Sequence, residues 1–193
     1  MKKIVKEMIS FIVKWKYRNR ITFEGNNQKF SRHTSVSLGF GATKEQLVLA
    51  ENVKLYGNIT LQGKGRVKMC SYAKIGNGSS IQCVNSVTIG KYTAIGQNTI
   101  ITDNNTHPTD PEYRKKMQMT PLGSNMRALI HSDNKPVDIG ENVWIGSNVR
   151  ICKGVTIGDN AIIAANSVVT KDVPKDAIAA GNPAKIVKMD YYK

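Results

Sequence analysis

The apolar residues of the segment from 137 to 174 recur at every sixth position. These positions hold Ile139, Ile145, Ile151, Ile157, Ile163 and Val169. A small residue follows nearly every one, and Asn, Asp or Gly stands three positions further on from each. Neither a 3.6-residue nor a two-residue period dominates, which argues against one amphipathic helix or ordinary half-buried strands. A fixed repeat this short predicts a solenoid, in which each unit buries its apolar residue by stacking on its neighbours.

Three hexads make one coil of a triangular parallel β-helix, with one short flat side for each hexad. The branched aliphatic residue points into the prism, and the small residue leaves room where two walls meet. Asn, Asp and Gly suit the corners because left-handed backbone conformations cost them little. A β-sandwich of short strands is the alternative, which six consecutive hexads with the same positional rules disfavour. The predicted fold class is all-β.

The repeat extends upstream and is interrupted once. Looser alternation from about Leu47 predicts early coils, and regular hexads run from Ile75 with one shift of two residues. The pattern stops at His107, where the next apolar residue would fall, and resumes at Val137. A non-repeating excursion of this length is usually functional, so residues 103–136 are predicted to form an extruded loop.

These boundaries divide the chain into three parts. Residues 1–40 form an N-terminal helix and cap, and residues 41–188 form the β-helix domain with its extruded loop. Residues 189–193 are a C-terminal tail. The segment after Lys175 predicts a turn at residues 181–183, followed by a short basic stretch with helical character.

Residues 1–20 predict a basic amphipathic helix. Its apolar positions include Ile4, Met8, Ile12 and Trp15. Seven basic residues stand against one acid, Glu7, and Lys14 and Lys16 keep the apolar run below membrane-spanning length. No small-residue cleavage site follows it, so it makes a poor signal peptide. Two interpretations stay open: docking on an anionic membrane surface, or a cap over the open end of the solenoid.

The composition favours a reduced setting and anionic partners. The 193 residues include 28 Lys and Arg against 14 Asp and Glu, a net charge of +14. The basic residues are spread along the chain without a nucleic-acid-binding motif, so no nucleic acid is expected as a partner. Cys70, Cys83 and Cys152 show no paired spacing. They are expected to be free thiols in a cytoplasmic protein, peripheral at the inner membrane face if the helix docks there.

Several segments resemble the hexapeptide-repeat acyltransferase family. They are residues 142–146 (NVWIG), 154–161 (GVTIGDNA), 166–174 (NSVVTKDVP) and 181–188 (GNPAKIVK). Thr106–Pro108 is similar to the maltose and galactoside acetyltransferase branch, and residues 101–105 to the branch that O-acetylates capsule and lipopolysaccharide. The resemblance implies a left-handed β-helix and acetyl-CoA as co-substrate. It also implies a homotrimer whose sites lie between neighbouring prisms.

A hydroxyl acceptor needs a base with a pKa near the working pH, which suits an imidazole. His107 opens the extruded loop and matches the family motif, so it is the predicted general base; His131 is the fallback. Asp103 or Asn105 would hold the imidazole tautomer, unless these two residues only shape a turn. The resemblance assigns the oxyanion donor to the backbone N–H of Ser147.

The remaining predicted site residues line the acceptor and coenzyme. Trp144 faces outward, where it lines the acceptor or pantetheine site or packs at a subunit interface. Small residues would leave a smooth wall for the pantetheine arm, and the resemblance adds further contacts, with lysines meeting the phosphates. The predicted coenzyme-binding residues are Gly146, Ser147, Ala164, Ala165, Thr170, Lys171, Lys185 and Lys188.

The favoured function is transfer of acetyl from acetyl-CoA to a hydroxyl of a cell-surface polysaccharide or its precursor. An N-acetyltransferase acting on an amino-sugar nucleotide or another small acceptor is the alternative. The prism-shaped zinc carbonic anhydrases are disfavoured, because the three histidines His33, His107 and His131 include no close pair. A non-catalytic scaffold would neither bind nor hydrolyse acetyl-CoA. No metal is expected.

Overall fold

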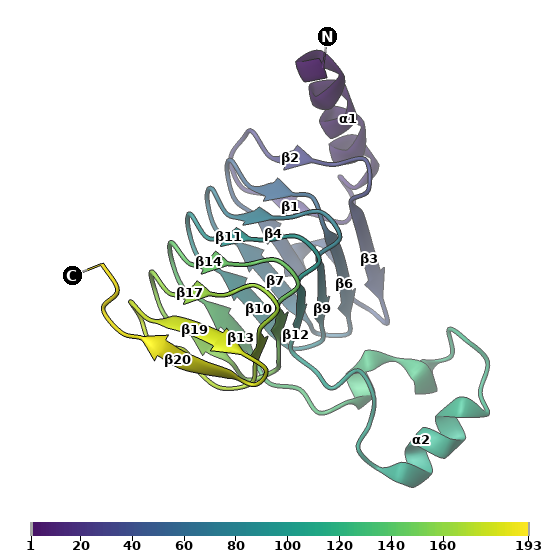
Figure 1. Cartoon of the computed structure of the whole chain (residues 1–193). Helices are drawn as coiled ribbons and strands as arrows, with labels where there is room; N and C mark the ends of the chain where they lie inside the picture. Colours follow the sequence, from purple (N-terminus) through teal and green to yellow (C-terminus); the bar gives the residue numbers. More distant parts are fainter. Residues whose placement is uncertain (1, 193) are drawn as a thin grey trace.

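The structure is a computed structural model that describes residues 2–192. The chain winds as six coils of a left-handed triangular β-helix (Figure 1). Face A contains β1 (Thr22–Phe23), β4 (Leu47–Leu49), β7 (Arg66–Met69), β10 (Ser86–Ile89), β13 (Val137–Ile139) and β16 (Thr156–Ile157). Face B contains β2 (Lys29–Phe30), β5 (Lys54–Leu55), β8 (Lys74–Ile75), β11 (Ala94–Ile95), β14 (Trp144–Ile145), β17 (Ile162–Ile163), β19 (Ile178–Gly181) and β20 (Ala184–Lys188). Face C contains β3 (Ser35–Gly39), β6 (Asn58–Gln62), β9 (Ser80–Cys83), β12 (Ile100–Thr102), β15 (Arg150–Ile151) and β18 (Val168–Val169).

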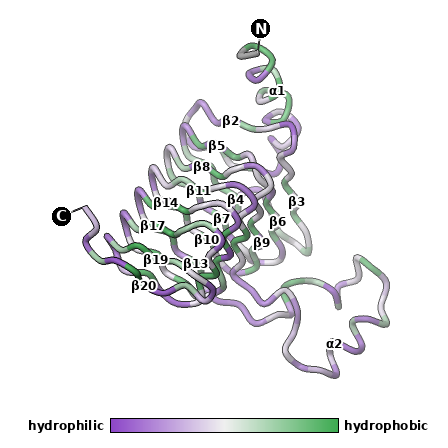
Figure 2. Tube along the Cα trace, viewed as in Figure 1, coloured by the Kyte–Doolittle hydropathy of each residue, from purple (hydrophilic) through white to green (hydrophobic). Residues whose placement is uncertain are grey.

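Ladders of inward-pointing apolar side chains run down each face and build the core. On face B the ladder comprises Phe30, Leu55, Ile75, Ile95, Ile145, Ile163 and Ala179, all buried. Ile89 pairs with Ile139 on face A, so the excursion between them interrupts the sequence but not the stack. The predicted prism and its inward residues are confirmed. Figure 2 shows the apolar residues along the strands of the prism and on α1 (Lys2–Lys16).

The number of residues in each coil explains the imperfect upstream pattern. Met69 pairs with Ile89, which lies twenty residues later, whereas Ile139 pairs with Ile157, eighteen residues later. A coil of three hexads needs eighteen residues. The early coils are longer than this, and the two additional residues between Met69 and Ile89 produce the shift between Ile81 and Ile89.

Left-handed residues occupy the corners, as predicted. Asn142, Asn148, Gly154, Asn160 and Asn166 have φ between 54° and 75°. Stacked asparagines also bond to one another, with Asn142 Nδ2 donating to Asn160 Oδ1 at 3.0 Å. The sixth predicted corner, Asp172, does not adopt this conformation. Its carboxylate instead accepts the backbone N–H of Thr156 at 2.7 Å.

Helix α1 covers the first coil, which begins earlier than predicted. Strands β1, β2 and β3 lie within the residues assigned to the cap, so the prism starts at Thr22 rather than near residue 41. Val13 and Tyr17 are buried against this coil, and Ser10 Oγ accepts the Phe30 N–H at 2.9 Å. The helix therefore packs on the first coil, the position that the cap interpretation predicts.

The excursion leaves the prism between β12 and β13 and is more ordered than a loop (Figure 1). This segment, which we call the arm (residues 103–136), contains α2 (Pro111–Gln118) and the 3-10 turns η2 (Asn125–Arg127) and η3 (Leu129–His131). A third such turn, η1 (Lys44–Gln46), precedes β4. At the other end of the prism, β20 pairs antiparallel with β19, so the predicted helical character of this segment is wrong.

Candidate active site

The arm is tied to the prism edge where face C turns into face A, the C–A edge. Asn105 N–H donates to the Asp133 carbonyl at 2.9 Å, and Lys135 N–H donates to the Asp103 carbonyl at 2.8 Å. These bonds join the outgoing and returning chains into a short neck. His107 is exposed at the start of the arm, two residues beyond Asn105. The neck thus holds an accessible imidazole beyond the edge of the prism.

Thr106 is the immediate partner of this imidazole. Its Oγ1 lies 2.6 Å from the Asn105 carbonyl oxygen and 3.1 Å from His107 Nδ1. A carbonyl only accepts, so the single hydroxyl proton goes to Asn105 and the hydroxyl oxygen must accept from Nδ1–H. This arrangement places the imidazole proton on Nδ1 and leaves the Nε2 lone pair free. The sequence analysis missed Thr106, although it lies next to His107 in the Thr-His-Pro motif.

Asp103 and Asn105 do not contact His107. The Asp103 carboxylate is fully buried, accepts the backbone N–H groups of Val84 and Asn85 at 2.7–3.1 Å, and accepts the Asn104 amide. Burial and this carboxylate raise the pKa of the Cys83 thiol well above its ordinary value. Asn105 bonds to Asp133 instead. Neither side chain holds the imidazole tautomer as expected: both shape the neck of the arm, and only the Asn105 backbone carbonyl acts on the imidazole, through the Thr106 hydroxyl.

Replacing Asp103 with Ala should lower the free energy of unfolding by about 1–3 kcal/mol, because it leaves the buried Val84 N–H and the half-buried Asn85 N–H without acceptors. Asp138, exposed on face A, is the matched control, and its change to Ala should stay within about 0.5 kcal/mol. Urea unfolding of the two variants measures both values. Equal stabilities would show that the Asp103 carboxylate does not hold the neck together.

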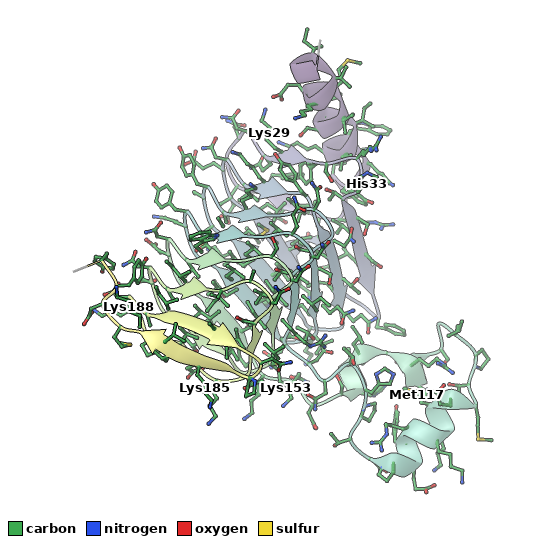
Figure 3. All side chains as sticks on the ribbon, viewed as in Figure 1. Lys29, His33, Met117, Lys153, Lys185 and Lys188 are labelled. Atoms are coloured by element: carbon green, nitrogen blue, oxygen red, sulfur yellow. The ribbon has the colours of Figure 1, made fainter. Side chains whose placement is uncertain are left out.

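His131, the fallback base, has a different environment. Its ring lies 5.7 Å from the Tyr113 ring of α2, centroid to centroid, in a tilted contact within the arm. Met117, which Figure 3 labels in the arm, and Ala128 are both buried. His131 therefore takes part in folding the arm, which distinguishes it from the unpacked His107.

Ser147 lies at another edge, where face B turns into face C, the B–C edge, and Trp144 lies on face B in the strand that leads to it. Ser147 follows β14, and within residues 2–192 its backbone N–H donates to no acceptor. Trp144 points outward from face B with 62% of its surface exposed, between Ala94 and Ile162 in register. The free N–H suits an oxyanion donor. The exposed indole offers an apolar wall beside it.

The predicted coenzyme-binding residues separate into groups. Gly146, Ala164 and Ala165 lie with Ser147 at the B–C edge, whereas Thr170 and Lys171 lie at the C–A edge. Lys185 and Lys188 are exposed on β20 at the C-terminal end of the prism (Figure 3). Gly146 also has a structural reason to be small, because a Cβ there would approach Ala165 N to 2.6 Å. One chain therefore does not bring His107 and Ser147 together: face C separates them.

The described residues show no helix with the length and apolarity needed to cross a bilayer. Nor do they contain a group of three or more His, Cys, Asp and Glu side chains that could hold a metal ion.

Comparisons with known proteins agree with this architecture. Residues 136–171 match the family model for the bacterial transferase hexapeptide, six repeats. Galactoside O-acetyltransferase of Escherichia coli K12 is 41% identical over 110 residues, covering 54% of this chain and 48% of its own. WbbJ of the same organism, named for O-acetyl transfer in lipopolysaccharide biosynthesis, is 34% identical over 126 residues, covering 65% and 62%. The solved structure of the polySia-specific acetyltransferase NeuO is 29% identical with a TM-score of 0.62, covering 88% of this chain and 70% of its own.

These features define a left-handed β-helix protein with an extruded arm that carries a histidine. The chain is similar to proteins of the bacterial hexapeptide-repeat transferase family, whose model matches its residues 136–171. It spans about half of the galactoside enzyme's length and about three fifths of WbbJ's.

Proposed function

We propose that this protein is an acetyl-CoA-dependent O-acetyltransferase acting on a hydroxyl of a cell-surface polysaccharide or its precursor. The observation that carries the proposal is His107, an exposed imidazole whose Nδ1 is bonded to a threonine hydroxyl and whose Nε2 is free. The names of its relatives, which specify galactoside, lipopolysaccharide and polySia acetylation, support a sugar acceptor.

The chemistry needs one base and one oxyanion donor. His107 Nε2 takes the proton of the acceptor hydroxyl as the oxygen attacks the thioester carbonyl of acetyl-CoA. The carbonyl oxygen becomes an oxyanion that accepts a hydrogen bond from the Ser147 N–H. The tetrahedral intermediate collapses when the C–S bond breaks, and the imidazolium returns its proton to the sulfur of coenzyme A. The products are the acetyl ester and free coenzyme A.

A complete site requires a second copy of the chain, because His107 and Ser147 lie at opposite edges of face C. We propose a homotrimer in which the C–A edge and arm of one subunit meet the B–C edge of the next. Such head-to-tail contacts form a closed ring when the rotation is threefold. The coenzyme-binding residues predicted at the B–C edge and at the C–A edge would then line one groove between subunits.

The proposal is tested by incubating the protein with acetyl-CoA and matched sugar acceptors that carry a free hydroxyl, a free amine or neither. Release of coenzyme A and mass spectrometry of the acceptor are the measurements. The expected result is an acetyl ester, which mild base removes. Exclusive formation of base-stable amides would establish the N-acetyltransferase instead, and failure to bind acetyl-CoA would establish a non-catalytic scaffold.

We also propose that α1 docks the protein on an anionic membrane surface. Six apolar residues form an exposed stripe: Ile4, Val5, Met8, Phe11, Ile12 and Trp15. This stripe lies opposite the buried face that contains Ser10, Val13 and Tyr17, so the same helix caps the prism and presents apolar side chains outward. Lys16 and Arg18 are exposed along it, a pattern typical of interfacial helices.

Replacing Phe11 and Trp15 with Glu should reduce binding to vesicles containing one third phosphatidylglycerol by more than about tenfold, because both changes remove apolar contact and add charge repulsion. Met119 and Leu122, exposed on the arm, provide the matched control when they are changed to Glu. Co-sedimentation at low and high salt measures binding, and high salt should weaken it in the unmodified protein. Equal losses in both double variants would exclude α1 as the docking element. Deleting the helix is a poorer test, because it uncovers the first coil.

A further inference from the structure

Two stacked tyrosines mark the third edge of the prism, where face A turns into face B, the A–B edge. Tyr72 and Tyr92 have φ of 65° and 59°, in the left-handed region. Half or more of each side chain is exposed, at 50% and 58%. Their rings stack with centroids 5.2 Å apart and planes 22° from parallel.

The left-handed backbone at this edge does not require a tyrosine. The other coils place Asn52, Asn142, Asn160 or Asp176 at the same edge, with φ between 54° and 60°. Asn and Asp tolerate this conformation, whereas a bulky residue there is strained. In two adjacent coils, Tyr72 and Tyr92 therefore combine a strained backbone with a solvent-exposed aromatic ring. Such combinations concentrate at binding sites.

A ladder of lysines runs beside the tyrosine stack on face B. Lys29, Lys54 and Lys74 occupy the same outward position on three neighbouring strands. Like charges directly opposite one another destabilise a sheet. Lys29 pairs with Glu7, but within residues 2–192 neither Lys54 nor Lys74 has an acidic partner. An anionic ligand would relieve this repulsion.

We propose that Tyr72, Tyr92, Lys54 and Lys74 form a binding track for an acidic polysaccharide. The apolar faces of sugar rings stack on exposed tyrosine rings, and carboxylates on the sugars pair with the lysine ammonium groups. This inference deepens the proposed function and rests on it, since it names the acceptor class as an acidic rather than a neutral glycan. The track binds sugars of the acceptor polysaccharide that are distant from the hydroxyl to be acetylated.

The track leads toward the proposed active site. From the A–B edge at Asn142 to Ser147 the chain advances five residues, about 16 Å if extended. Trp144 is exposed on face B along this path. The proposed trimer uses the two edges that border face C, so the tyrosine edge remains outside the assembly. A polymer bound across face B can therefore reach the B–C edge.

The chain offers variants that separate this track from general charge attraction. Changing Tyr72 and Tyr92 to Asn installs the residue that other coils use, so the melting temperature should not fall. Phe40 is an exposed aromatic residue with φ of 53° at the C–A edge, and its change to Asn is the matched control. Lys54 and Lys74 changed to Gln are compared with Lys115 and Lys116 on α2 changed to Gln, which removes the same charge elsewhere.

The probes are polygalacturonate oligomers, dextran of matched length and single-stranded RNA, with calorimetry and fluorescence polarisation as the measurements. We expect the tyrosine variant and the lysine variant each to weaken polygalacturonate binding about tenfold, while both controls bind like the unmodified protein. Dextran should bind to none of them. Equal affinity for dextran, tighter binding of RNA, or no difference between track variants and controls would each overturn the proposal.

Activity of the tyrosine variant on short and long acceptors distinguishes a missing track from a missing acetyltransferase activity. The tyrosine variant should still transfer acetyl to a small sugar acceptor at the unmodified rate, because that acceptor is too short to span the track. Binding without any acetyl transfer would refute the O-acetyltransferase and leave a glycan-binding surface. Transfer that is insensitive to the track variants for every acceptor length would refute the track alone.

Discussion

Replacing His107 with Ala should lower kcat for acetyl transfer by about 10²- to 10⁴-fold, the usual contribution of a positioned general base. The side chain is exposed, and within residues 2–192 its one hydrogen bond is to Thr106, so the fold and the affinity for acetyl-CoA should not change. Steady-state kinetics with calorimetric titration of the coenzyme measure both quantities. Activity close to that of the unmodified protein would remove His107 from the mechanism.

Three further variants sharpen this test. His131→Ala should retain most of the activity, with a loss of stability confined to the arm through the missing Tyr113 contact. Thr106→Val removes the hydroxyl that accepts from Nδ1–H, so kcat should fall about tenfold with little change in KM, since base orientation acts in the transition state. Thr106→Ser restores the hydroxyl and should restore kcat. A purely structural role for Thr106 would not produce this recovery.

The sequence predicted the prism well because its packing is periodic. Ile145 and Ile151 are six residues apart because one face of the triangle separates them, and every coil repeats the constraint. The first coil was assigned to the cap because it shows no run of hexads: Phe30 and Val36 are six residues apart, but Phe23 and Phe30 are seven apart, with polar residues between them. Their inward direction follows from pairing with the next coil, which a single sequence does not display.

The site was predicted only in part. His107 and Ser147 could be chosen from motifs, but their separation depends on which edge each turn occupies. A signal for this was present: Ile101 ends a face C hexad and Ile145 ends a face B hexad, so counting hexads places the following turns at different edges. The roles of Asp103 and Thr106 had no such signal. They depend on the neck of the arm, where residues far apart in the chain exchange hydrogen bonds.

Subunits that carry complementary defects should regain activity when they assemble together. A His107→Ala chain keeps an intact B–C edge, and an Ala165→Trp chain keeps His107 but fills the coenzyme wall with an indole. Ala165 is exposed, so the larger side chain is compatible with the fold. Each variant alone should be inactive. If the site joins the arm of one subunit to the B–C edge of the next, an active site forms wherever an Ala165→Trp chain precedes a His107→Ala chain.

The recovered activity has a fixed size. A three-membered ring that contains both kinds of chain has one boundary in the productive order, whether its composition is 2:1 or 1:2, so each mixed trimer should show about one third of the unmodified activity. Co-expression with two different tags, tandem purification and a coenzyme A release assay measure this fraction. Pairing His107→Ala with the double variant His107→Ala/Ala165→Trp is the control, since no boundary then contains an intact histidine. Mixed trimers without recovery would place the whole site within one chain, against the separation of His107 and Ser147 across face C.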